Sequence, residues 1–111
     1  MNWIQAGIRK SIKGLFSRSV EISAATLEYR TEQIRETIFL SLGDFGRKQY
    51  PLVCQRLRYA EDVNSLWYLR SEVMAVLSAK QGEKAAKREM LRISKLFRGL
   101  LPAGLTKSRW S

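Results

Sequence analysis

The stretch VNSLWYLRSEVMAVLSA, residues 63–79, decides the fold of this 111-residue chain. Its apolar residues recur at spacings that place them on one side of an α-helix, and Asp62 is expected to cap the start of that helix. The predicted inner face consists of Val63, Leu66, Trp67, Val73, Met74 and Leu77, widened by Leu69 and Val76. A helix with so wide an apolar face is typical of the centre of a helical bundle, so we expect the other segments to pack around it.

A strongly basic segment follows at residues 80–98. Four apolar residues fall on one side of the helix predicted here: Met90, Ile93, Phe97 and Leu100. Seven cations fall on the opposite side or next to it: Lys80, Lys84, Lys87, Arg88, Arg92, Lys95 and Arg98. Gly82 predicts a kink or a short turn, although one continuous helix from residue 63 to residue 100 is the alternative. Leu91 lies inside the basic face, where it marks an interface or is a scattered exposed leucine.

Three further helices are predicted before this pair. Residues 3–17 have the pattern of an amphipathic helix with a basic outer side, and residues 20–42 that of a long helix with an apolar packing seam. Gly43 is expected to end the long helix. Residues 47–59 form the third helix, and Pro51 suits its first turn.

No segment alternates polar and apolar residues over the length of a strand. We therefore expect an all-α fold, a small bundle of four or five helices that are mostly antiparallel because the connections are short. Residues 1–102 are expected to form one helical domain, on which the helix over residues 3–17 is loosely docked. Residues 103–111 are expected to be a flexible basic tail.

The composition argues against several classes of function. The chain has 20 Lys and Arg against 10 Asp and Glu, a net charge of +10, no histidine and one cysteine, Cys54. It therefore lacks a histidine-based catalytic triad and the ligands of a common zinc site, and it has no glycine-rich phosphate-binding motif. We expect a non-enzymatic protein without a cofactor or a metal. A single cysteine, expected in the core, fits a cytoplasmic location.

The large positive charge favours an anionic partner, and nucleic acid is the leading hypothesis. Lysines and arginines along one helix face can follow a phosphate backbone and release its counterions. The residues expected to bind are Lys80, Lys84, Lys87, Arg88, Arg92, Lys95 and Arg98. A second basic patch consists of Arg47, Lys48, Arg56 and Arg58. The basic face has no Asn and only Gln81 at its start, so little sequence preference is expected.

Two other functions stay open. The chain is a protein–protein adaptor or a homo-oligomer, with Leu91 and Trp110 as candidate partner contacts, or it lies on a membrane surface through residues 3–17. An acidic stripe on the long helix bears on this choice, and it consists of Glu21, Glu28, Glu32 and Glu36. The stripe either covers the basic face or leaves it free to bind a partner.

Overall fold

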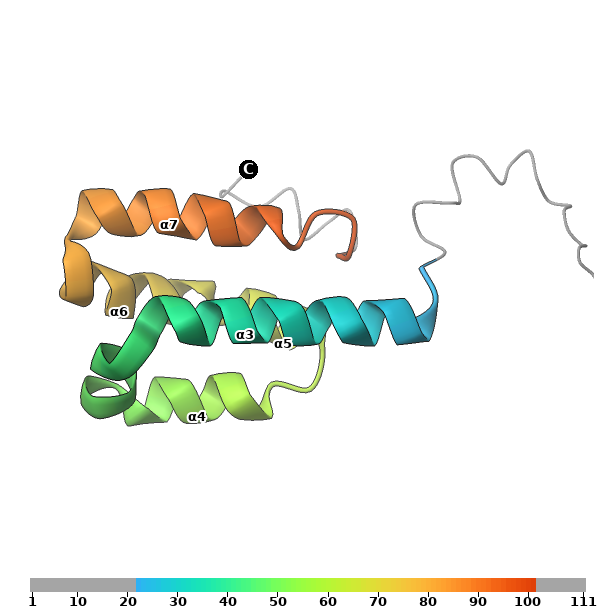
Figure 1. Ribbon diagram of the computed structural model, residues 1–111, viewed down its shortest axis with the longest axis horizontal. Helices are drawn as coiled ribbons and strands as arrows, with labels where there is room; N and C mark the ends of the chain where they lie inside the picture. Colours follow the sequence, from blue (N-terminus) through green and yellow to red (C-terminus); the bar gives the residue numbers. More distant parts are fainter. Residues whose placement is uncertain (1–21, 102–111) are drawn as a thin grey trace, which may run out of the picture.

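The computed structural model describes residues 22–101, which form an all-α fold (Figure 1). Five helices lie within this part of the chain: α3 (Ala24–Gln49), α4 (Pro51–Tyr59), α5 (Val63–Tyr68), α6 (Arg70–Gln81) and α7 (Glu83–Lys95). The predicted all-α class is confirmed. The helix predicted over residues 3–17, the tail over residues 103–111 with Trp110, and Glu21 lie outside the described residues.

Helix α3 is longer than predicted and is bent. It begins after Ser23, whose hydroxyl accepts a hydrogen bond from the Thr26 backbone N–H at 3.1 Å, and not at residue 20 as expected. Gly43 interrupts the helix, with φ 59° and ψ −159°, a conformation that favours glycine. Regular helix geometry thus stops at Gly43, where the end of the long helix was predicted, and the chain then resumes helical geometry as far as Gln49.

The central apolar stretch is two helices and not one. The Asp62 carboxylate accepts a hydrogen bond from the Ser65 N–H at 2.9 Å, so the predicted cap is confirmed for α5. The helix ends at Leu69, where ψ is 5°. Arg70 spans this break: its Nε donates to the Trp67 carbonyl at 2.8 Å, and its guanidinium lies 3.6 Å from the centroid of the Trp67 ring. Two contacts of Arg70 with Trp67 therefore bridge the break between the helices. The sequence has no glycine or proline there that would have predicted it.

Gly82 separates α6 from α7, with φ 89°. The predicted turn is therefore confirmed, and the alternative of one continuous helix from residue 63 to residue 100 is wrong. After α7 the backbone continues in tighter turns, with N–H groups bonded to carbonyls three residues earlier as far as Leu100.

One hydrophobic core joins the helices. Figure 1 shows α3 in the middle of the molecule, with α7 on one side and α4 on the other, and the α3–α4 and α6–α7 connections at the same end. All four apolar residues predicted for the inner side of the last helix are buried, and the Phe97 ring meets the Trp67 ring edge-on at 4.9 Å between centroids. Cys54 is a free cysteine and is also buried. The central helices bury Val63, Leu66, Trp67, Val73, Val76 and Leu77.

Candidate nucleic-acid interface on α7

The side of α7 that faces away from the core carries a line of exposed side chains. They follow one another at intervals of four, three, four and three positions, which keeps them on one helix face. We call this line the outer row, and it consists of Lys84, Arg88, Leu91 and Lys95 of α7 together with Arg98 in the turns that follow the helix. Lys84 and Lys95 are eleven residues apart in the sequence, so this part of the row is about 16 Å long. Within residues 22–101, none of its four cations forms an ion pair.

Two predicted binding residues flank the outer row and have acidic partners. The Lys87 Nζ lies 3.6 Å from the Glu83 carboxylate, and Arg92 donates a hydrogen bond to Glu89 at 2.5 Å. Exposed ion pairs of this kind stabilise a fold by only about 0–1 kcal/mol, but they offset the charge of both cations. The outer row therefore holds the unneutralised positive charge of this helix.

Lys80 lies apart from the outer row, on α6 and across the turn at Gly82. Its Nζ donates a hydrogen bond to the Ser41 carbonyl at 2.6 Å, close to the bend of α3. Lys80 thus links α6 to α3, and we do not include it in the interface.

Glu89 occupies the edge of α7 that faces α3. It accepts a hydrogen bond from the Ser41 hydroxyl at 2.5 Å and another from Arg92. Both bonds lower the pKa of Glu89 below its ordinary value, and the bond from Ser41 has the larger effect. The carboxylate is therefore ionised at neutral pH. Glu83, the other acid of α7, lies in the first turn, where a negative charge suits the helix N-terminus. Both acids lie outside the outer row.

The second predicted basic patch is largely engaged within the fold. Arg47 pairs with an aspartate one turn earlier, and the Arg56 Nε donates to a glutamate of α6 at 3.0 Å. The Arg58 guanidinium lies over a phenylalanine ring of α3, 5.2 Å from its centroid. Lys48 is exposed and has no ion pair to another described residue. This patch consequently offers less free charge than the outer row.

The acidic stripe of α3 does not cover the outer row. Among the described residues, no ion pair joins Glu28, Glu32 or Glu36 to α7. Glu32 instead binds Arg35 of its own helix at 3.0 Å, and this hydrogen bond lowers the pKa of Glu32. Arg35 also donates to the Leu57 carbonyl at 2.6 Å, near the end of α4. As far as the described residues reach, the outer row is therefore open.

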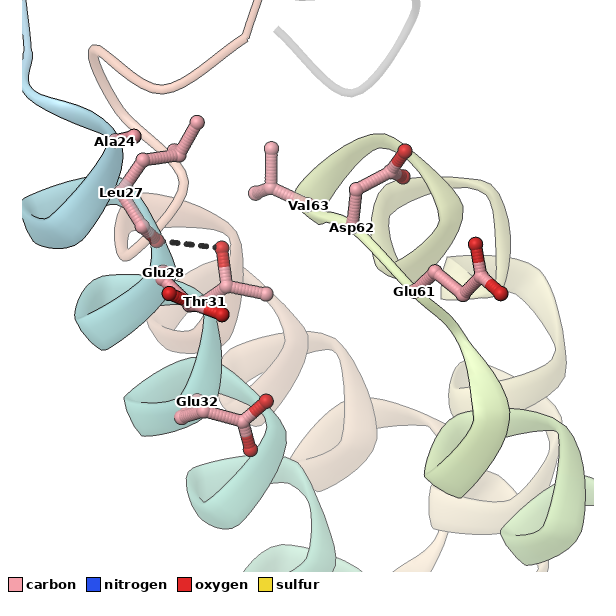
Figure 2. A pocket seen from close by; sticks show the side chains of 8 residues that line it. All are labelled: Ala24, Leu27, Glu28, Thr31, Glu32, Glu61, Asp62 and Val63. Carbon is pink, nitrogen blue, oxygen red and sulfur yellow. Dashed lines mark hydrogen bonds between the residues drawn. The ribbon is translucent and has the colours of Figure 1, made fainter.

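Two of these glutamates border a groove at the start of α3 (Figure 2). Its volume is about 210 Å³, and we call it the acidic groove. The apolar part of its lining consists of Ala24, Leu27 and Val63, with Thr31 beside them. Four carboxylates line the rest: Glu28 and Glu32 of α3, and Glu61 and Asp62 of the α4–α5 connection. The Thr31 hydroxyl donates to the Leu27 carbonyl of its own helix at 2.7 Å, which occupies its polar hydrogen within α3. The sequence pattern did not indicate this groove.

In the part of the chain that the structure describes, no cluster of His, Cys, Asp and Glu side chains is suited to hold a metal ion. The same residues include no helix with the length and apolar character needed to cross a bilayer.

Comparison of the chain with protein-family models, with curated proteins and with solved structures gives no match in any of the three.

Proposed function

We propose that this protein is a cytoplasmic, non-enzymatic binding protein whose outer row contacts the phosphates of a nucleic-acid duplex without reading its sequence. One observation carries the proposal. Four cations that have no ion pair within residues 22–101 lie on the exposed side of α7 and of the turns that follow it, and the opposite side of α7 is fixed in the core by Ala86, Met90 and Ile93.

The dimensions of the outer row suit a duplex backbone. Each strand of double-stranded DNA carries about one phosphate per 3.4 Å of the duplex axis, so about five phosphates of one strand lie along a line about 16 Å long. The helix that carries the cations is already ordered, so binding has to restrict only their side chains. The row contains no Asn or Gln that could pair with adenine, and a duplex is therefore expected to bind with little regard to sequence.

A salt titration tests the proposal. Fluorescence anisotropy of a labelled duplex of about 20 base pairs gives the binding constant at several salt concentrations. If all four cations contact phosphates, the logarithm of the binding constant falls against the logarithm of the salt concentration with a slope of about −3.6. Between about 50 and 200 mM salt the affinity then decreases about 150-fold. A folded protein that shows no binding at micromolar concentration in low salt contradicts the proposal and favours the adaptor hypothesis.

Two double variants with equal loss of charge locate the contact. Arg88→Gln with Lys95→Gln removes two cations of the outer row, and the slope should shrink to about −1.8, a decrease of about 12-fold over the same salt range. Lys87→Gln with Arg92→Gln removes two cations that already have acidic partners, and the slope should stay near the wild-type value. Equal effects of the two double variants would show that only net charge matters and that the row is not the interface.

A further inference from the structure

We propose that the acidic groove binds the outer row of a second copy of this chain, with Leu91 as the central apolar contact. The inference adds a site, the acidic groove, and gives the outer row a second partner that competes with nucleic acid, but it does not depend on the proposed function. The two surfaces are complementary in charge and in the placement of their apolar parts.

The outer row has an apolar centre that nucleic-acid phosphates do not require. Leu91 is 53% exposed, with Arg88 one turn before it and Lys95 one turn after it. Lys84 and Arg98 extend the row at its two ends. A partner that fits this surface offers an apolar hollow with negative charge around it.

The acidic groove has that composition. Figure 2 shows Leu27 and Thr31 on the α3 wall and Val63 on the other side of the hollow, with carboxylates on both walls. Two of the carboxylates are held ionised by their own bonds. The Arg35 guanidinium lowers the pKa of Glu32, and the Ser65 backbone N–H lowers the pKa of Asp62.

The match is close in number as well as in sign. Four cations accompany one exposed leucine on the outer row, and four carboxylates accompany one apolar hollow of about 210 Å³ in the groove. The long stems of Lys and Arg can cover apolar surface while their charged ends reach the carboxylates. Such charge complementarity speeds association and fixes the orientation of the partners.

A second copy is the occupant that these observations favour. The outer row faces away from the core, and no described ion pair joins it to the groove within one molecule. Every copy carries both surfaces, so each can supply the row for the groove of another. The contact joins two different surfaces, the row of one copy and the groove of another. It gives a closed dimer only if each of the two copies inserts its row into the groove of the other.

Two charge-reversed full-length variants are needed for the test. The row variant combines Arg88→Glu with Lys95→Glu. The groove variant combines Glu28→Lys with Glu61→Lys, because these two carboxylates have no hydrogen bond or ion pair within residues 22–101. The other two carboxylates of the groove stay unchanged, since they hold an arginine of α3 and the start of α5. Circular dichroism verifies that both variants are helical.

Sedimentation velocity measures the size of the species in solution for the wild type, for each variant and for their mixture. The samples contain no nucleic acid and about 50 mM salt, so that exposed charges are only weakly screened. The wild type should form a species larger than the 12.8 kDa monomer, and each variant alone should be monomeric. An equimolar mixture should associate again as a one-to-one complex, because the row variant keeps its groove and the groove variant keeps its row. Leu91→Ala should weaken self-association about tenfold or more with no change in charge.

A monomeric wild type, a variant that still associates alone, or a mixture that stays monomeric would each overturn the proposal. The outcome is separate from that of the duplex titration. The groove variant keeps all four cations of the row, so its duplex binding should be no weaker than that of the wild type. If the wild type does not bind the duplex, the proposed function fails, but the sedimentation experiment, which contains no nucleic acid, still tests self-association.

Discussion

Phe97→Ala is expected to lower the free energy of unfolding by about 3–5 kcal/mol. Phe97 lies beyond the last residue of α7, yet only 1% of its surface is exposed, and its ring meets the Trp67 ring at 4.9 Å between centroids. Arg70 stacks on Trp67, which restrains the indole from moving into the space that the lost ring leaves. The substitution should therefore leave a cavity that the core fills only in part.

Leu91→Ala is the matched control, because it also removes a large apolar side chain but from the exposed side of α7. Leu91 also lies in the proposed contact between copies, so both variants are compared at about 1 M salt, which screens that contact. The expected effect of Leu91→Ala on the free energy of unfolding is then within about 0.5 kcal/mol. Urea unfolding followed by circular dichroism measures both variants. A small domain loses about 4–8 °C of melting temperature for each kcal/mol, so Phe97→Ala should lower the melting temperature by at least about 12 °C. A loss below about 1 kcal/mol, or a loss equal to that of Leu91→Ala, would show that the turns after α7 do not belong to the core.

Three further substitutions test local contacts. Glu89→Gln should destabilise the protein at neutral pH, because hydrogen bonds from Ser41 and Arg92 lower the pKa of Glu89 in the folded state. That stabilisation is present above the ordinary pKa of the carboxyl and is lost as the pH falls through the lowered pKa, so the urea midpoints of wild type and variant should converge in acid. A gap that persists in acid would contradict this account. Asp62→Ala removes the cap of α5 and should cost about 1 kcal/mol in thermal unfolding, whereas Asp62→Asn, which keeps a capping oxygen, should cost much less. Gly82→Ala meets no atom within 4 Å but must adopt φ near 89°, so it should cost about 1–2 kcal/mol, and a stabilised variant would refute the backbone argument.

The sequence predicted those helix ends that depend on local chemistry. Asp62 can cap a helix through its own side chain, and Gly82 adopts a positive φ at little cost, so both ends follow from residue type. The break at Leu69 has no such signal. It is held by contacts of Arg70 with Trp67, and Trp67 packs on Phe97 thirty residues later. Helical periodicity does not encode which residues meet across the core.

The candidate site was also predictable only in its local part, the exposed face of one helix, and not in its contacts with other helices. The spacing of apolar and basic residues predicted the exposed face of α7, because a helix that buries one side must expose the other. The contact of Lys80 was not predictable, since its bond to the Ser41 carbonyl joins residues far apart in sequence. The acidic groove was missed for the same reason: Glu61 lies across from α3 only after the chain has folded.

Hydrogen bonds of Ser41, close to the bend at Gly43, join α3 to both α6 and α7. Regular helix geometry stops two residues after Ser41, whose carbonyl accepts a hydrogen bond from Lys80 of α6 and whose hydroxyl donates one to Glu89 of α7. One residue near an irregularity of α3 thus serves as the anchor for both helices that come about forty positions later. The bond from Ser41 reaches the middle of α7, so it fixes the direction in which the exposed side of that helix faces.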